Sequence, residues 1–131
     1  MNAFIISAPN KPGELARISE AIALRGINIT SLSSLGWGDE GAIALTTNDE
    51  AGTRSALAGI GQIKELELIP VSLEDRPGTL AVATRKLSDA GINIDLLLPV
   101  GMREGKVTIA LATSDNAKAR DLIGSGALAS A

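Results

Sequence analysis

The chain has 131 residues, a net charge of −3 and 45% hydrophobic residues, a composition typical of a folded globular protein. It has no Cys and no His, which excludes disulfides, thiolate chemistry and histidine-activated nucleophiles, and we expect no metal, no cofactor and no catalysis. Aromatic residues make up only 2%, which with the negative charge argues against nucleic acid as a partner. No apolar run approaches the roughly 18 residues that span a bilayer, so we expect a cytoplasmic protein that binds no membrane.

The first half of the chain predicts a strand, a helix, a hairpin of two strands and a second helix. The apolar residues 4–6 predict a strand that Pro9 ends. Apolar side chains three and four residues apart then predict a helix that ends at Gly26. Residues 27–35 and 42–47 predict two strands, and Asn48-Asp49 can cap a second helix that extends to about residue 60.

The second half predicts the same elements in the same order. The expected ranges are a strand at 68–73, a helix at 77–90, strands at 92–100 and 106–113, and a helix from Ser114-Asp115 to about 123. Residues 36–41 and 101–105 are the expected hairpin turns.

These two halves are copies of one unit, because their motifs recur in register. Asn10-Lys11-Pro12-Gly13-Glu14-Leu15 returns 65 residues later as Asp75-Arg76-Pro77-Gly78-Thr79-Leu80. Gly26-Ile27-Asn28-Ile29 returns at the same spacing as Gly91-Ile92-Asn93-Ile94. Such a repeat predicts a pseudo-symmetric protein with a seam between its copies, and seams favour small-molecule sites.

The order of elements predicts an α+β fold of two ferredoxin-like βαββαβ units, each an antiparallel sheet with its helices on one face. We expect the units at residues 1–65 and 66–131, with residues 62–67 as the last strand of the first. The last strand of the second, at residues 127–131, is short or missing. Because each copy alone buries little surface, we expect the units to lie side by side and to share a core or a continuous sheet.

The loop between the first strand and the first helix of each copy is the candidate binding site. Gly13 and Gly78 let a ligand approach the backbone, and the N–H groups that begin the helix favour an anion such as a carboxylate. The amides of Asn28 and Asn93, at the start of the next strand, can both donate and accept hydrogen bonds. Together these groups suit a zwitterion, although the same residues also fit ordinary turn and cap chemistry.

The doubled Asn/Asp-x-Pro-Gly-x-Leu motif, followed a helix later by Gly-Ile-Asn-Ile, strongly resembles the ACT domain family over nearly the whole chain. The resemblance implies a regulatory module that binds a free amino acid at the seam between two units, forms a homodimer and acts on an enzyme of amino-acid metabolism. The candidate ligand-binding residues that it implies are Asn10, Lys11, Pro12, Gly13, Glu14, Leu15, Asn28, Asp75, Arg76, Pro77, Gly78, Thr79, Leu80 and Asn93. The two half-sites differ in charge, because Asp75 stands where the first copy has Asn10.

Two other functions stay open. The protein can be a ligand-free interaction module that dimerises and docks on a metabolic enzyme; the apolar hairpin residues Trp37 and Met102 would suit a partner, or fold back on their own copies. It can also be an acylphosphatase-like hydrolase with Arg76 in a phosphate loop, but the corresponding residue is Lys11 and the Pro-Gly that follows fits the ACT pattern better.

Overall fold

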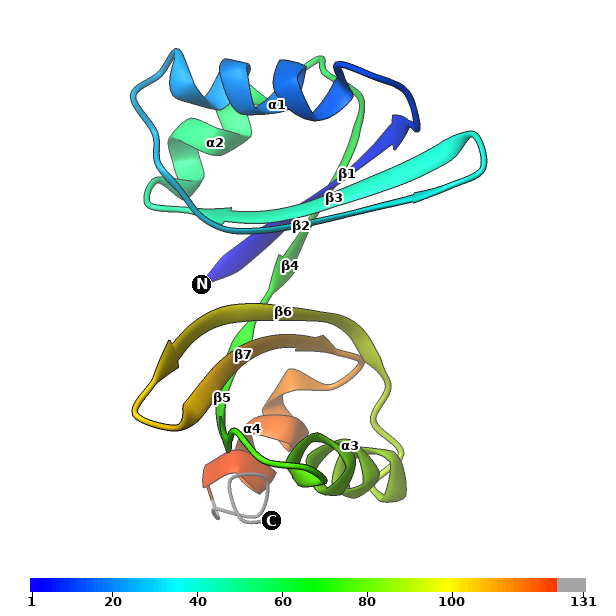
Figure 1. The fold of residues 1–131 in the computed structure, drawn as a ribbon, viewed down its shortest axis with the longest axis vertical. Helices are drawn as coiled ribbons and strands as arrows, with labels where there is room; N and C mark the ends of the chain where they lie inside the picture. Colours follow the sequence, from blue (N-terminus) through cyan, green and yellow to red (C-terminus); the bar gives the residue numbers. More distant parts are fainter. Residues whose placement is uncertain (125–131) are drawn as a thin grey trace. The chain divides into compact units, whose positions relative to one another are not determined.

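The computed structural model describes residues 1–124, which form seven strands and four helices (Figure 1). The strands fall into two sheets, and each sheet has two helices on one of its faces. No helix in this part of the chain is both long and apolar enough to cross a membrane.

The first unit, Met1–Leu66, has the element order β-α-β-β-α-β that the sequence predicts. Its elements are β1 (Asn2–Pro9), α1 (Glu14–Ala23), β2 (Ile29–Trp37), β3 (Glu40–Thr47), α2 (Glu50–Ala56) and β4 (Gln62–Glu67). The strands are ordered β2-β3-β1-β4, with β3 antiparallel to both neighbours. This is the ferredoxin-like arrangement, so the predicted fold class is confirmed.

The second unit begins at Glu67 and repeats this order up to its second helix. Its elements are β5 (Ile69–Glu74), α3 (Thr79–Asp89), β6 (Ile94–Arg103), β7 (Lys106–Thr113) and α4 (Asn116–Gly124). The sheet has the order β5-β7-β6, with both pairs antiparallel. The weak last strand expected at residues 127–131 lies outside the described residues.

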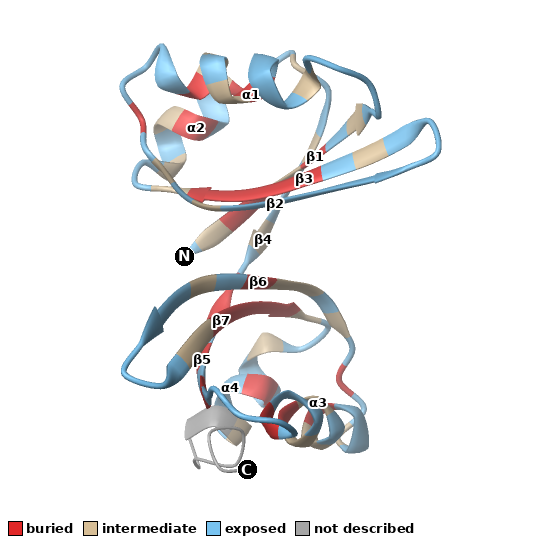
Figure 2. Cartoon of the chain, in the orientation of Figure 1, coloured by how far each residue is buried: buried red, intermediate tan, exposed pale blue. Residues whose placement is uncertain are grey.

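Each unit has a hydrophobic core between its sheet and its helices (Figure 2). In the first unit, Phe4 and Ile6 alternate along β1 toward the helices, and Ile18 and Ile22 lie one turn apart on α1. In α3, Leu87 corresponds to Ile22 and is also completely buried. The alternation in β1 and the helical spacing of Ile18, Ile22 and Leu87 therefore match the buried side chains, whereas Leu15 and Leu80, at the starts of the same two helices, are exposed.

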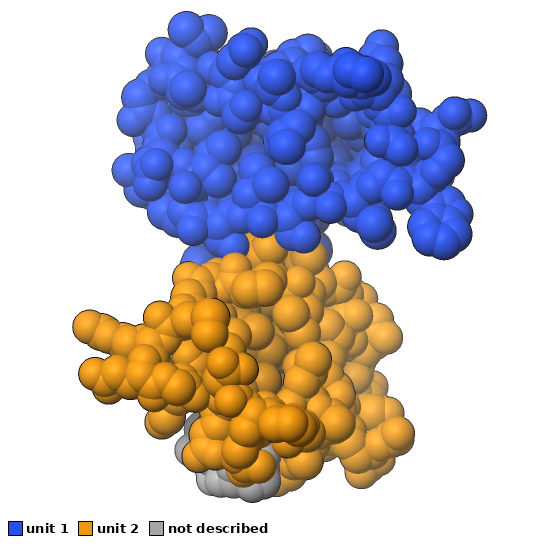
Figure 3. All heavy atoms as spheres, viewed as in Figure 1, with its two compact units in different colours: residues 1–66 blue, residues 67–131 orange. Residues whose placement is uncertain are grey.

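The expectation of one shared core or continuous sheet is wrong. The strands form two separate sheets, and the two core clusters have no residue in common (Figure 3 colours the units). Only Leu68 separates β4 from β5, yet β4 pairs with β1 and β5 with β7. Each unit closes a core of its own because its helix pair supplies enough apolar side chains to cover its own sheet.

Both hairpins are tighter than the sequence predicts, and α2 is shorter. Strand pairing continues to Trp37 opposite Glu40, and to Arg103 opposite Lys106, so each connection has two residues. The α2 helix ends at Ala56, not near residue 60, and Gly59 follows with a φ of +81°. A two-residue turn depends on strand pairing, which local residue preferences do not record.

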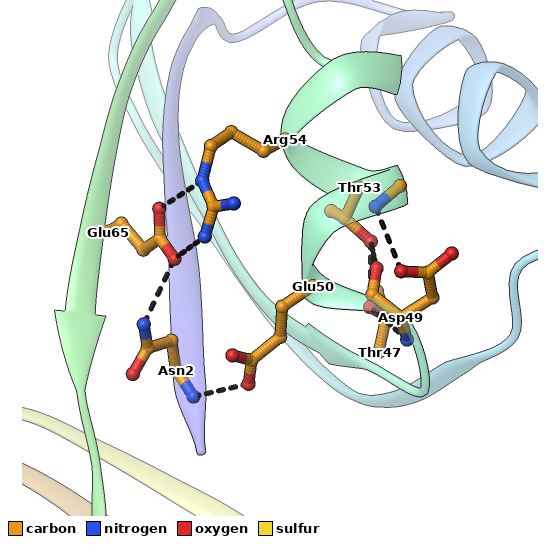
Figure 4. Close-up of polar contacts among 8 residues, drawn as sticks. Asn2, Thr47, Asp49, Glu50, Thr53, Arg54 and Glu65 are labelled. Carbon is orange, nitrogen blue, oxygen red and sulfur yellow. Dashed lines mark hydrogen bonds and ion pairs between the residues drawn. The ribbon is translucent and has the colours of Figure 1, made fainter.

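A network of ion pairs and hydrogen bonds connects β4 to α2 and β1 in the first unit (Figure 4). The Arg54 guanidinium on α2 donates from Nε to Oε2 of Glu65 at 2.9 Å and from Nη2 to Oε1. The Nδ2 of Asn2 also donates to Glu65 Oε1, at 3.0 Å, and the Asn2 backbone N–H donates to Glu50 Oε2 at 2.7 Å. The hydrogen bonds from Arg54 and then Asn2 lower the pKa of Glu65 to about 2.

The start of α2 shows the cap that the sequence predicts, at Asp49 (Figure 4). The Asp49 Oδ1 accepts from the Gly52 backbone N–H at 2.9 Å. The Thr53 hydroxyl donates to the Asp49 carbonyl at 2.7 Å and lies 2.7 Å from the Thr47 hydroxyl, which ties the helix to β3. In the second unit Asp115 Oδ1 accepts from the Lys118 N–H at 3.0 Å, so the repeat extends to the caps.

Candidate functional site

The helices that follow the Pro-Gly motifs begin on glycine in a left-handed conformation. Gly13 has a φ of 94° and Gly78 a φ of 93°, and neither helix start receives a hydrogen bond from a capping side chain. A side chain would be strained at both positions. The chain therefore turns into each helix on glycine, and the first N–H groups of the helix have no side-chain cap.

Beside the first of these helix starts lies a hollow of about 110 Å³. Its walls are the loop after β1, the first turn of α1 and the hairpin end of β2 and β3. The residues around it that come from the predicted site are Asn10, Lys11, Glu14 and Leu15, and the hairpin strands add Ser34, Leu35, Gly36 and Ile43.

The second unit has a hollow in the corresponding place, of about 250 Å³. The predicted residues that line it are Asp75, Arg76, Gly78, Thr79 and Leu80, joined by Leu73, Leu97, Val107 and Ile109. Asp75, Arg76, Thr79 and Leu80 are the repeat partners of the four predicted residues around the first hollow, and Ile109 is the partner of Ile43. The two units therefore present the same kind of concavity at the same place in the fold.

Asn10 closes the loop onto the β2–β3 hairpin, a contact that the sequence did not reveal. Its Nδ2 donates to the Gly38 carbonyl at 2.9 Å, and its backbone N–H donates to the Asp39 carbonyl, also at 2.9 Å. A Cβ added at Gly36 would lie 2.5 Å from Asn10 Oδ1, so the strand needs glycine where the asparagine packs on it. Gly36 recurs 65 residues later as Gly101, and this recurrence was the signal that the sequence offered.

Asp75 makes the same backbone contact but leaves its side chain without a partner. Its N–H donates to the Gly105 carbonyl at 2.8 Å. Asp75 is one of the residues that line the second hollow, and its carboxylate receives no hydrogen bond or ion pair within residues 1–124. A Cβ on Gly101 would meet nothing within 4 Å, since the Asp75 side chain does not pack there as Asn10 packs on Gly36.

The residues that begin the two helices differ in chemistry. Glu14 lines the first hollow with a side chain that is 13% exposed, and its Oε2 accepts from Arg17 Nε at 3.0 Å and Nη2 at 2.8 Å. The Lys11 ammonium lies 4.0 Å from Glu14 Oε1. In the second unit the buried Thr79 takes this position, and its hydroxyl donates to the Glu74 carbonyl at 2.8 Å.

Arg76, the residue on which the phosphate-loop alternative depends, is paired with Glu74. The Nε of Arg76 donates to Glu74 Oε2 at 2.6 Å, and this hydrogen bond and the guanidinium charge lower the pKa of Glu74. The pair stands at the edge of the second hollow. A guanidinium held by a carboxylate is a poor cradle for a phosphate.

Asn28 and Asn93 do not join the hollows of their own units. Asn28 precedes β2, whereas the first hollow meets that strand at its other end, about 20 Å away at the usual rise per residue. Its N–H donates to Asn48 Oδ1 at 3.0 Å. Asn93 donates from its N–H to Ser114 Oγ at 2.9 Å and from Nδ2 to Asp95 at 2.8 Å. Asn28 thus joins the start of β2 to the segment after β3, and Asn93 joins the start of β6 to the segment after β7.

Three other predicted residues shape the loops without lining a hollow, namely Pro12, Gly13 and Pro77. The strand residues Leu35, Leu97 and Val107 line a hollow and were missed. Their alternation marks them as strand residues, but only the pairing of the hairpin brings them beside the helix start. Within residues 1–124 no group of three or more Asp and Glu could hold a metal ion.

Residues 3–63 match the ACT domain family. No curated protein matches the sequence. Among solved structures, the protein BT0572 from Bacteroides thetaiotaomicron is 21% identical, with a TM-score of 0.81 over 95% of this chain and 87% of that one.

Two further structures are regulatory subunits of aspartate kinase. The subunit from Thermus thermophilus, in its ligand-free form, is 20% identical, with a TM-score of 0.63 over 85% of this chain and 82% of that one. The subunit from Thermus flavus is 20% identical, with a TM-score of 0.64 over 90% and 86%. At such identities the likeness establishes the fold.

Proposed function

We infer that this chain, an ACT domain protein through its residues 3–63, is a regulatory module that binds a free amino acid and catalyses no reaction of its own. The observation that carries the proposal is the hollow that recurs beside the glycine-started helix of both units. We further propose that residues 66–131 are a second ACT-like domain, which the repeated motif and the matching order of elements support.

The groups around the second hollow suit the parts of an amino acid. Uncapped N–H groups at the start of α3 favour a carboxylate, through hydrogen bonds and the helix dipole. The unpartnered carboxylate of Asp75 favours an ammonium group. Leu73, Leu97 and Val107 offer an apolar wall for a side chain. The basic residue that lines this hollow, Arg76, is paired with Glu74, which supports a neutral amino acid over a phosphorylated metabolite.

We propose a homodimer and an enzyme of amino-acid metabolism as the partners. The edge strand β2 carries no charged residue over its nine positions, and an edge strand without charges is suited to pairing with another chain. The enzyme is supported by the likeness to regulatory subunits of aspartate kinase.

Thermal unfolding with each of the twenty amino acids at millimolar concentration tests the proposal. A ligand that binds only the folded protein stabilises it by about 2.7 kcal/mol at a hundredfold excess over Kd. Asp75→Asn keeps the shape of the side chain and removes its charge. We therefore expect the affinity for the amino acid to fall about tenfold, which reduces the stabilisation by the ligand by about 1.4 kcal/mol. Asp121→Asn makes the same charge change at an exposed position of α4 outside the hollow, and should leave the shift intact.

A second function, that of a ligand-free docking module, is favoured by the two hairpins. Trp37 is 83% exposed and its counterpart Met102 is 71% exposed, and large apolar side chains in such places are typical of partner contacts. If none of the twenty amino acids raises the unfolding temperature, amino-acid binding is rejected and this function takes its place.

A further inference from the structure

The two hollows occupy equivalent places but differ in size and lining. The first, at about 110 Å³, corresponds to the bulk volume of about four water molecules, and the second, at about 250 Å³, to that of about eight. Where the second has Leu73 and Val107, the first has Ala8 and Gly41, so its apolar wall is smaller. Size and apolar surface both favour the second hollow for a ligand with an aliphatic side chain.

The first hollow is lined by a carboxylate-bearing residue at the start of its helix, Glu14. Glu14 stands at the first position of α1, where a negative charge interacts favourably with the helix dipole. Its side chain is nearly covered and is held by two N–H groups of Arg17, with the Lys11 ammonium 4.0 Å away. A ligand carboxylate would have to share this place with a like charge.

The amide that would face a ligand ammonium in the first hollow is also occupied. Asn10 Nδ2 donates to the Gly38 carbonyl at 2.9 Å, and its side chain is neutral. In the second hollow, Thr79 brings no charge to the helix start, because its hydroxyl is bound to the Glu74 carbonyl. Asp75 there has no partner among the described residues. The second hollow therefore has an uncapped helix start beside an unpartnered carboxylate, whereas in the first hollow Glu14 places its own carboxylate beside the helix start and the Asn10 amide is already bonded.

We propose that each chain binds one amino acid with a neutral aliphatic side chain, in the hollow of the second unit; this inference rests on the proposed function. In the first unit Glu14 lines the equivalent, smaller hollow, and its carboxylate disfavours the carboxylate of a ligand there. The residue that decides between the two hollows is the first residue of the helix, Glu14 in α1 and Thr79 in α3. Binding is thus asymmetric although the fold repeats.

Titration calorimetry of the full chain with L-valine, L-leucine and L-isoleucine tests this inference. We expect one molecule per chain, and at least a tenfold loss of affinity in Thr79→Glu, which places in the second hollow the carboxylate that occupies the first. Thr84→Glu adds the same charge to the same helix outside the hollow and should bind as the unaltered protein does. Two equivalent molecules per chain, or unchanged binding by a folded Thr79→Glu variant, would overturn the inference.

A second pair of variants covers the case in which Thr79→Glu does not fold. Leu15 and Leu80 are repeat partners, line the two hollows and are 41% and 47% exposed, so a glutamate is tolerated at either. We expect Leu80→Glu to weaken binding tenfold or more and Leu15→Glu to change it less than twofold. Equal losses in both contradict the asymmetry. Binding of charged amino acids alone would refute the aliphatic class while leaving the regulatory function standing, and no binding by any amino acid would reject both.

Discussion

At the residue scale, equivalent positions of the repeat have acquired different contacts. Asn10 packs against Gly36 and binds the hairpin, whereas Asp75 leaves its carboxylate in the second hollow. The sequence predicted both residues as site residues and noted their difference in charge. It could not predict which side chain is engaged, because the partner of Asn10 lies 28 residues away and is brought near only by the fold.

The two glycines beside these residues make a matched test. A Cβ on Gly36 would displace the Asn10 side chain, so we expect Gly36→Ala to lose the bond to Gly38 and about 1 kcal/mol of stability. Gly101→Ala meets open space, and the reduced freedom of the unfolded chain should stabilise the protein by about 0.5 kcal/mol. Urea unfolding measures both, and equal effects would show that Asn10 does not depend on Gly36.

At the element scale, the strands and helices were largely predictable, but the contacts that hold the outer strand β4 were not. The range 62–67 was expected as a strand and is one. Its attachment depends on Glu65, whose ion pair with Arg54 joins residues 11 apart on different elements. A Glu in a strand of alternating polarity indicates only that the residue faces solvent. Its partner, Arg54, is brought close only by the packing of α2.

This ion pair predicts a dependence of stability on pH. The pKa of Glu65 is lowered in the folded protein from 4.5 to about 2, so the unfolded chain takes up a proton more readily. The contribution is therefore fully present above pH 4.5 and is lost as the pH falls through about 2. In Glu65→Gln, the free energy of unfolding measured with urea should fall less steeply between pH 5 and 2, about the range that these pKa values bound.

The control for this titration is Glu20→Gln, on an exposed position of α1. If both variants keep the acid sensitivity of the unaltered protein, the pair with Arg54 is not what stabilises the folded state at neutral pH.

At the scale of the whole molecule, the chain consists of two units with separate sheets and separate cores. The sequence predicted two copies and placed their boundary near residue 65, but it also suggested that they share a core. That suggestion came from the small size of each copy, and it underestimated how completely two helices cover one small sheet.

Separate cores predict separable effects of core substitutions. Ile22 and Leu87 are repeat partners without exposed surface, so truncation of either to alanine should cost about 2–5 kcal/mol. We expect Ile22→Ala to reduce the amide exchange protection of β1 and β3, and Leu87→Ala that of β5 and β7. Loss of protection throughout the chain in either variant would mean that the units unfold as one.

The sequence alone determined the order of the elements and the repeat, since these depend on residues within a few positions of one another or on a pattern that recurs along the chain. The α1 face at Ile18 and Ile22 and the cap at Asp49 are examples. The tertiary structure decided that there are two cores, that Asn28 and Asn93 lie away from the hollows of their units, and that Glu14 lines one of these hollows. The reason is that pairing and packing bring together residues distant in the chain, and local patterns carry no record of which distant residues will meet.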